Sequence, residues 1–576
     1  MFSQIRSHTM SLALVVLQSS AAAWADIAGA LTYKGTSHVF QGCPGGKQPG
    51  STAKGWHHAA STDLVHWEDR GIHVEAIAES YEGFTSNTSP CSGFVAVDDD
   101  GVPCAGFRQC GSITGLTGLN PRAHKWDAPL EIRCATNANL TAWGKPDYLF
   151  PVYFYRGLPY DPTRPWKDAD GKWYATISTD GCNTTRYPAN DTDRNCPAGG
   201  RLDLWTSPKL HGAGSDWKYV GPMITTPKTP IDSSATHEFV TSGYFGEIPG
   251  DPRGGKTRVV TNNDCNHGAT NMGTPIYYVG QQSNGSPFKD TAGGQEFTGQ
   301  NEIGMIDWGA YTPKTTAESK GAKGVKALKG GNPRGYSMAR TLGSDPNQVA
   351  VKGRRTIVAW VSSAFTSQSL LQDLSMGGTA ADPYLKQTFI PELAMLRESK
   401  IDLSAAGAEA VAGQQFEVLA TVKSAADGGG GKTSFQVLVS AAGSTSIGID
   451  WDAGLVYVDG RKQGNNVLRA GPLLGVQTTA NLHVYVDHSI IAVICNNRTS
   501  LTVAVGPDAD ATGMKLPSSG VTAEAWTLKT ANRNSHLEAQ LDAPCDCKGI
   551  GCPCAAGTPP KPNWVPKIHN SPACLH

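Results

Sequence analysis

The sequence predicts an all-β protein, and three observations lead to this prediction. Glycine (66 residues) and proline (36 residues) are abundant, whereas charged residues make up only 17% of the 576-residue chain. This balance suits short strands joined by turns better than long helices. Short apolar or alternating runs recur and end at turn residues, as 93–97 does before Asp98-Asp-Asp-Gly101. Such a pattern indicates a sandwich, a barrel or a propeller, and periodicity alone does not choose among the three.

The length of the chain favours two large domains, because a single core rarely grows this large. Strand-like runs fill a first region, 26–395, and begin again in a second region, 400–535. The stretches 415–422 and 482–487 are typical strands of the second region. A tail, 541–576, is rich in Cys and Pro, and we expect it to be a disulfide-bonded appendage; a zinc or copper site is the alternative.

The first 25 residues resemble an export signal. Arg6 and His8 precede the apolar run 12–17, and small residues follow. A buried N-terminal strand is the alternative. The chain also has 14 cysteines and six glycosylation sequons, which favour a secreted, glycosylated and oxidised protein. The sequon asparagines are Asn87, Asn139, Asn183, Asn190, Asn284 and Asn497.

Composition also limits the partners that we expect. The net charge is −1, which gives no electrostatic reason to expect binding to nucleic acid. The apolar run near the N-terminus is too short for a membrane anchor, and no second stretch is long enough to span a bilayer. The sequence does not indicate an oligomeric state.

Several runs of the chain follow one another in a known order. Asp26 leads into a strand that ends at Tyr33-Lys34-Gly35, and then come Gln41 and the run Ser-Thr-Asp-Leu-Val-His-Trp at 61–67. These runs resemble the first blade of glycoside hydrolase family 32, the invertases and fructan hydrolases. Further runs that resemble the family lie at 306–315, 354–360, 387–393, 485–489 and 496–499. The resemblance covers roughly 25–530. It implies a five-bladed β-propeller followed by a C-terminal β-sandwich, with no cofactor and no metal in the reaction.

Glycosidic hydrolysis requires two carboxyl groups, one on each side of the scissile bond. The resemblance makes Asp26 the nucleophile and Glu238 the general acid and base. It gives Asp161 the role of binding sugar hydroxyls and supporting the transition state. A general acid of this kind must stay protonated near neutral pH, through burial or a nearby like charge.

The motifs around these carboxylates depart from the family pattern. The run 25–29 replaces Asn-Asp-Pro-Asn-Gly, and Phe239 stands where the family has a Cys after the acid/base. Tyr160 replaces the Arg that normally precedes Asp161, so a bidentate clamp is lost. Glu247 lies close to Glu238 in sequence and is the rival candidate for the general acid.

We expect the sugar itself to be contacted by aromatic and polar side chains. The resemblance nominates Gln41, Trp56, Phe84, Thr85 and Tyr160 for this role. Each of these residues could equally serve ordinary packing.

The sequence therefore predicts a secreted glycosidase that cleaves terminal β-D-fructofuranosyl units from sucrose or fructans by a retaining mechanism. A fructosyltransferase of the same family is one alternative, because only the acceptor differs. A carbohydrate-binding homologue with weakened catalysis is a second, and the altered motifs favour it. A Cys-rich metal binder, which rests on the tail alone, is a third.

Overall fold

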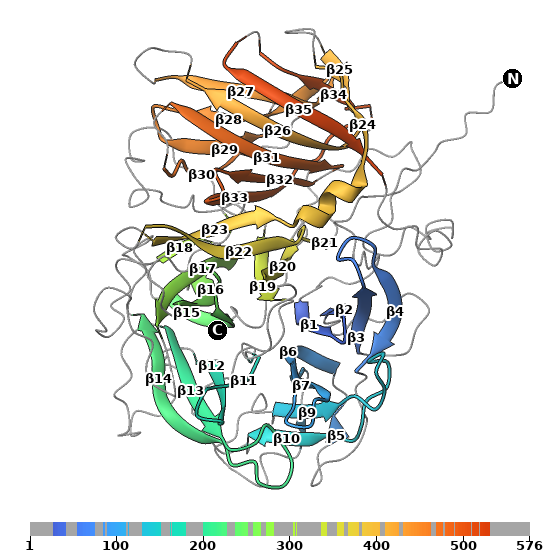
Figure 1. Ribbon diagram of the computed structural model, residues 1–576, viewed down its shortest axis with the longest axis vertical. Coiled ribbons are helices and arrows are strands. Elements are labelled where there is room, and N and C mark those ends of the chain that lie inside the picture. Colours follow the sequence, from blue (N-terminus) through green and yellow to red (C-terminus); the bar gives the residue numbers. More distant parts are fainter. Residues whose placement is uncertain are drawn as a thin grey trace, which may run out of the picture.

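Five antiparallel sheets surround a common axis, and a two-sheet sandwich lies beside them (Figure 1). The computed structural model describes residues within 27–529, with gaps. The longer gaps are 42–54, 75–84, 115–129, 151–161, 180–199, 227–236, 282–302, 308–335 and 342–353. The predicted export signal (1–25), the tail (541–576), and the insertions 181–200 and 317–334 lie mostly or wholly outside the described residues. The all-β prediction and the propeller followed by a sandwich are confirmed.

Each of the five sheets is one blade. Blade 1 contains β1 (Ile27–Tyr33), β2 (Thr36–Gln41), β3 (Trp56–Ser61) and β4 (Glu68–His73). Blade 2 contains β6 (Ser89–Val97), β7 (Pro103–Cys110), β9 (Leu130–Cys134) and β10 (Asp147–Phe150). Blade 3 contains β11 (Trp166–Lys167), β12 (Trp173–Thr179), β13 (Gly200–Ser207) and β14 (Lys218–Thr226).

The two remaining blades follow the same plan. Blade 4 contains β15 (His237–Glu247), β16 (Thr257–Asn266), β17 (Met272–Gln281) and β18 (Ile303–Met305). Blade 5 contains β19 (Tyr336–Thr341), β20 (Arg355–Val361), β21 (Ser367–Gln368), β22 (Gln372–Gly378) and β23 (Pro383–Phe389). A separate two-stranded pair is formed by β5 (Thr85–Ser86) and β8 (Ile113–Thr114).

Short-range turn chemistry fixes the first hairpin. Tyr33 pairs with Thr36, and the two residues between them, Lys34 and Gly35, have φ values of 47° and 82°. A two-residue turn with positive φ at both positions matches the right-handed twist of the strands that it joins. Glycine adopts this conformation without strain, and the turn therefore sets the register of β1 against β2.

A 3₁₀ helix, η4 (Pro391–Leu396), leads from the propeller to the sandwich. The first sandwich sheet contains β24 (Arg397–Lys400), β35 (Val521–Leu528), β26 (Gln415–Lys423), β31 (Thr479–Asp487), β32 (Ile490–Cys495) and β33 (Thr499–Ala504). The second contains β25 (Glu409–Val411), β34 (Gly513–Lys515), β27 (Lys432–Ser440), β28 (Gly443–Asp450), β29 (Leu455–Asp459) and β30 (Leu468–Pro472). Within the described ranges, no helix is both long and apolar enough to cross a bilayer.

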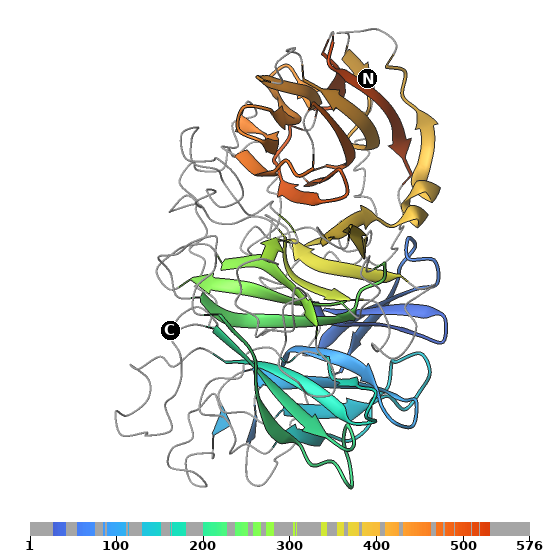
Figure 2. The ribbon, with the colours of Figure 1, turned by 60° about the vertical axis from the view of Figure 1, so that its left-hand side comes forward.

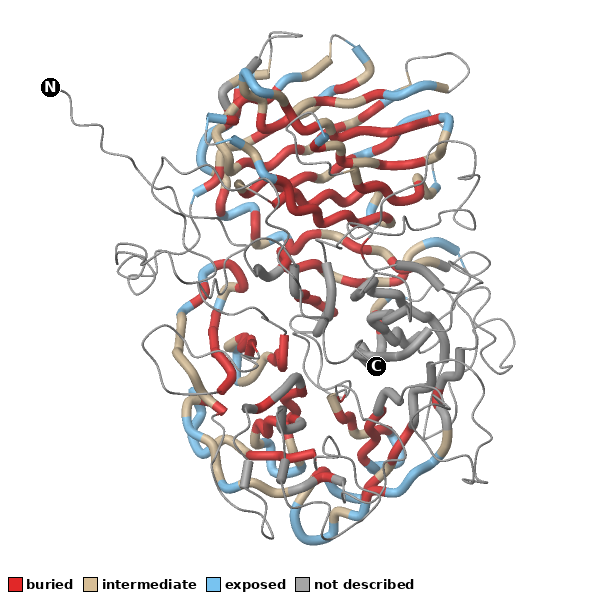
Figure 3. Tube along the Cα trace, turned by 180° about the vertical axis from the view of Figure 1, so that it is seen from behind, coloured by how far each residue is buried: buried red, intermediate tan, exposed pale blue. Residues whose placement is uncertain are grey.

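Buried residues, red in Figure 3, are frequent in the two sandwich sheets, and their side chains form a core between the sheets. Phe416 and Val418 of one sheet face the same core as Phe435 and Ile447 of the other. This arrangement follows from strand alternation, because every second residue of β26 and β27 points inward.

A second hydrophobic cluster joins the propeller to the sandwich. It includes Ile27 of blade 1, Phe389 of blade 5, and Tyr485 and Ile494 of the sandwich. Figure 2 shows the same arrangement, with the sandwich stacked on blades 1 and 5. The first strand of the propeller therefore packs against the joint between the two halves.

Candidate active site

The first strand of every blade lies next to the axis. β1, β6, β11, β15 and β19 each start a sheet whose later strands pair outward (Figure 1). β1 contacts β6 and β19, and β15 contacts β19. Because each blade begins on the inside and proceeds outward by antiparallel pairing, the inner strands share one direction. Their N-terminal ends therefore gather at one end of the ring.

The three carboxylates predicted from sequence belong to chain positions that lead into inner strands. Asp26 directly precedes Ile27, the first residue of β1, but is itself outside the described residues. Asp161 is also outside them and precedes the first residue of β11 by five positions. Glu238 is the second residue of β15, and its side chain is not described. Their catalytic roles stay predictions.

The two rival candidates for the general acid lie at different ends of the same strand. Glu238 lies at the N-terminal end of β15, and its backbone pairs with Cys265. Glu247 is the last residue of the same strand. Nine residues of extended chain span about 30 Å. The two carboxylates therefore belong to opposite ends of the blade, and only Glu238 is at the end where the inner strands begin.

Gln41 is the predicted substrate residue with the most direct structural link to this end of the ring. It pairs in register with Ile27 on β1 and with His57 on β3. Its exposed fraction is 2%, so the side chain is enclosed beside the start of β1. A contact between Gln41 and a sugar stays a prediction.

Trp56 packs between blades 1 and 2. The ring is fully buried and lies edge-on to Phe107 of β7, with 5.3 Å between the ring centroids. This is the packing role that the sequence left open, and a substrate contact of Trp56 remains untested. Thr85 pairs with Thr114 through the backbone of the β5–β8 pair. Phe84 and Tyr160 lie outside the described residues.

An arginine links the chain that leads into β11 to the first inner strand. Arg164 Nη2 donates a hydrogen bond to the backbone oxygen of Ala30 in β1. Arg164 follows Asp161 by three residues. The bond holds the beginning of blade 3 close to blade 1, and sequence reasoning did not find it because the two residues are 134 positions apart.

A buried histidine cluster crosses blade 1, and sequence reasoning missed it as well. His38 Nδ1 and His58 Nε2 share a hydrogen bond of 2.9 Å, and the ring of His58 stacks on Phe40. Burial, with a smaller effect from the positive charge of Arg70, lowers the pKa of His38 to about 4. Burial and the neighbouring histidines lower the pKa of His58 to about 2. Both rings are therefore neutral near pH 7. The available sequence signal was the spacing of His38 and Phe40, which are two residues apart and therefore lie on the same face of the strand.

Among the described residues, one group of side chains has the composition of a metal site. It consists of Asp98, Cys104, Cys134 and His211. Cys104 and Cys134 form a disulfide. Asp98 follows the last residue of β6, so the group lies at the end of blade 2 opposite to the start of its inner strand. It is therefore not part of the candidate active site.

Two family models match the chain. The N-terminal domain of glycosyl hydrolases family 32 matches residues 17–193, and the C-terminal domain of the same family matches residues 392–532. Together they cover more than half of the chain, one in the propeller and one over the sandwich.

Curated relatives are similar to this chain in sequence, and a solved structure is similar to it in fold. An extracellular exo-inulinase of Aspergillus awamori is 24% identical over 87% of this chain and 90% of its own length. The Arabidopsis thaliana β-fructofuranosidase CWINV6 is 26% identical over 48% of this chain, which spans about half of that relative (45%). The crystal structure of fructan 1-exohydrolase IIa from Cichorium intybus aligns with a TM-score of 0.62 at 16% identity, covering 90% of this chain and 97% of that one.

Proposed function

Since this chain belongs to glycoside hydrolase family 32, we propose that it is a secreted glycosidase that releases terminal β-D-fructofuranosyl units from sucrose or fructans. The names of its relatives support the substrate class, because they include exo-inulinases and β-fructofuranosidases. The observation that carries the proposal is where three acidic residues fall in the sequence relative to the inner strands. Asp26, Asp161 and Glu238 lead into or lie in the inner strands of blades 1, 3 and 4.

In the proposed reaction, Asp26 attacks the anomeric carbon of the fructosyl unit while Glu238 protonates the leaving oxygen. The glycosidic bond breaks, and a covalent fructosyl–Asp26 ester forms. Water then attacks the ester, Glu238 takes the proton, and free fructose leaves. A retaining mechanism of this kind requires the two carboxyl groups to be about 5–5.5 Å apart. Asp161 stabilises the oxocarbenium-like transition state through the sugar hydroxyls.

Four observations support secretion. The N-terminal segment has the composition of an export signal. The described sequon residues Asn139 and Asn497 are both exposed, so each could carry a glycan. A disulfide joins Cys104 and Cys134, which suits an oxidising compartment. Two of the relatives are named extracellular exo-inulinases.

The experiment is chromatography of the sugars released from sucrose and, separately, from inulin. The parent protein is compared with Asp26→Asn and Glu238→Gln. Glu247→Gln is the matched control, because it makes the same chemical change at the other end of β15. We expect free fructose from the parent and from Glu247→Gln. We expect a loss of at least about 10³-fold in kcat in the other two variants, because each removes a group of the reacting pair.

The remaining outcomes distinguish the alternatives. Fructose-containing trisaccharides from sucrose at high concentration would indicate a fructosyltransferase, in which a sugar acceptor competes with water. Absence of any product, together with measurable binding of inulin by the folded protein, would indicate a binding homologue. An active Glu238→Gln protein with an inactive Glu247→Gln protein would overturn the assignment of the general acid.

A further inference from the structure

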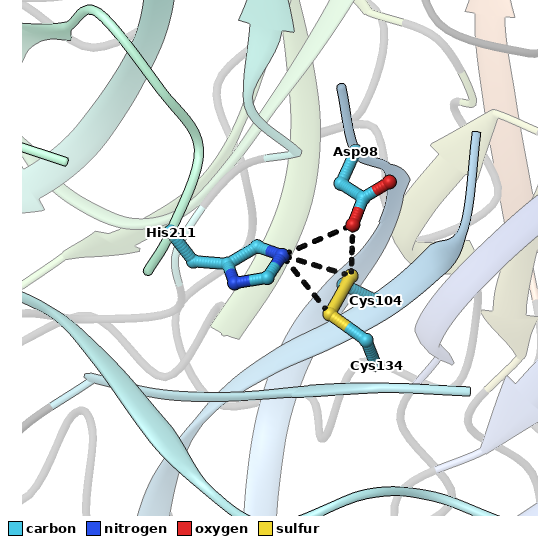
Figure 4. Close-up of side chains that lie close together, drawn as sticks. All are labelled: Asp98, Cys104, Cys134 and His211. Atoms are coloured by element: carbon cyan, nitrogen blue, oxygen red, sulfur yellow. Dashed lines mark hydrogen bonds and ion pairs between the residues drawn. A yellow bond between two sulfur atoms is a disulfide. The ribbon is translucent and has the colours of Figure 1, made fainter. Parts of the chain in front are cut away.

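Four side chains from blades 2 and 3 converge on one point (Figure 4). Asp98 lies in the hairpin between β6 and β7, Cys104 on β7, Cys134 at the end of β9, and His211 between β13 and β14. His211 Nε2 is 3.1 Å from Asp98 Oδ2, 3.2 Å from Cys134 Sγ and 3.6 Å from Cys104 Sγ. Asp98 Oδ2 is 3.6 Å from Cys104 Sγ. One potential ligand atom of each residue lies within 4.8 Å of all the others.

The backbone holds these side chains in place. Asp98 Oδ1 accepts hydrogen bonds from the backbone nitrogens of Asp100 (3.0 Å) and Val102 (2.8 Å). This pairing fixes the carboxylate and leaves Oδ2 directed at His211. The two cysteines pair in register across β7 and β9, with 3.9 Å between their Cα atoms. The residue after His211, Gly212, donates its backbone N–H to Asp147 on β10 (2.8 Å).

In the disulfide form, these four residues can form few hydrogen bonds with one another. A disulfide sulfur carries no hydrogen, so Cys104 cannot donate to the carboxylate of Asp98 that lies against it. His211 Nε2 carries at most one hydrogen, and Asp98 is the stronger acceptor for it. Electron-rich atoms from four residues therefore surround one point, and a cation at that point would interact favourably with all of them.

The spacing of the four atoms is close to that of zinc ligands. A tetrahedral zinc ion has Zn–S bonds of about 2.3 Å and Zn–N and Zn–O bonds of about 2.0–2.1 Å, so its ligand atoms lie roughly 3.3–3.8 Å apart. The nitrogen–oxygen, nitrogen–sulfur and oxygen–sulfur separations given above range from 3.1 to 3.6 Å. The separations of His211 Nε2 from Asp98 Oδ2 and from Cys134 Sγ are slightly shorter than this range, and the two bonded sulfur atoms would separate once their bond breaks.

We propose that Asp98, Cys104, Cys134 and His211 bind one zinc ion when the disulfide is reduced. With a phosphine as reductant, the phosphorus takes an oxygen atom from water, the S–S bond breaks, and two thiols form. Zinc then displaces the two thiol protons and binds two thiolates, the imidazole nitrogen and the carboxylate oxygen. The disulfide links two strands within blade 2, whereas the zinc ion also links blade 2 to blade 3 through His211.

The test is a count of zinc bound per chain in the full-length protein. The protein is reduced with a phosphine, equilibrated with buffered zinc, and separated from free metal before elemental analysis. Cys134→Ser and His211→Ala each remove one ligand. The matched control is His66→Ala, which removes an exposed histidine that pairs with Asp63 on blade 1. Cysteines elsewhere in the chain contribute equally to all four proteins.

We expect the parent and His66→Ala to bind one more zinc per chain than Cys134→Ser and His211→Ala. We also expect cobalt to give a thiolate charge-transfer band in the parent that is weaker in Cys134→Ser. Without reduction, all four proteins should bind the same amount. Equal zinc content in the four reduced proteins would overturn the proposal.

Stability of the variants is controlled in two ways. The His211 side chain is only 25% exposed, so its truncation to alanine also removes packing, and circular dichroism verifies that the variant folds. A second preparation is expressed in a reducing cytosol with zinc present throughout, which avoids reduction of the folded protein. The same difference of one zinc per chain is expected there, and its absence again overturns the proposal.

Discussion

The joint between propeller and sandwich depends on one buried carboxylate, Asp307, and replacing it tests this interpretation. Asp307 has no exposed surface and accepts three hydrogen bonds from β33. Ser500 Oγ donates at 2.8 Å, and the backbone nitrogen and hydroxyl of Thr502 each donate at 2.9 Å. Ser500 itself accepts a hydrogen bond from Gln372 of blade 5 at 3.2 Å. The carboxylate therefore ties the end of blade 4 to the sandwich.

The expected cost of Asp307→Ala is about 3–5 kcal/mol. A hydrogen bond to a charged group contributes roughly 1.5–3 kcal/mol, and each buried donor left without an acceptor costs roughly 1–3 kcal/mol. The backbone N–H of Thr502 cannot turn to another acceptor, whereas the two hydroxyls can rotate, so the sum lies below three full penalties. Asp307→Asn keeps one acceptor oxygen and the shape of the side chain, and should cost about 1–2 kcal/mol.

The assay is urea unfolding with limited proteolysis of the segment between propeller and sandwich. We expect a lower unfolding midpoint and faster cleavage in Asp307→Ala, with Asp307→Asn between it and the parent. Thr502→Val, alone and combined with Asp307→Ala, completes a double-mutant cycle. We expect a coupling of at least about 0.5 kcal/mol, because the two residues are in direct contact. An unchanged midpoint in Asp307→Ala, or strict additivity in the cycle, would refute the interpretation.

Three further predictions concern buried titratable groups. Burial, aided by Arg70, lowers the pKa of His38 from 6.5 to about 4, so the unfolded chain binds the proton more readily than the folded one. The free energy of unfolding should therefore fall by about 3 kcal/mol between pH 6.5 and pH 4. Urea titrations at the two pH values should show a smaller loss in His38→Gln. Burial alone would raise the pKa of Glu417, but hydrogen bonds from Arg397 and His483 lower it from 4.5 to about 2, so its contribution is complete above pH 4.5 and is lost as the pH falls toward 2. Glu417→Gln should flatten the acid limb of a stability–pH curve and cost about 2–3 kcal/mol at pH 7; an unchanged limb would contradict this. Burial raises the pKa of the Cys495 thiol to about 12, so iodoacetamide should label Cys495 only after denaturation, and labelling of the native protein, detected by mass spectrometry, would show that the thiol is accessible.

Local sequence predicted much of the fold. The Tyr33-Lys34-Gly35 run forms the turn that its composition requires, and the Asp98-Asp-Asp-Gly101 run forms the turn between β6 and β7, with φ of 77° at the glycine. These features depend on residues close together in the chain, so the sequence encodes them directly. The order of the family-like runs then led to the propeller and the sandwich.

Side-chain partners from distant strands could not be predicted in this way. The resemblance suggests a sugar contact for Trp56, which stays a prediction, whereas only the structure shows that its ring packs on Phe107 between blades 1 and 2. The hydrogen bond between Arg164 and Ala30 and the neutral pair of His38 and His58 depend on how one blade is placed on the next. Sequence gives no measure of these distances.

The sequence by itself determined the strands, their turns, the family and the identity of the candidate carboxylates, because all of these depend on local patterns and their order. Tertiary structure decided which groups meet. It paired Cys104 with Cys134, brought His211 to them from 77 residues beyond Cys134, and placed Asp307 against Ser500. Such contacts depend on strand register and on the packing of blades that are far apart in the chain, so only the folded molecule fixes them.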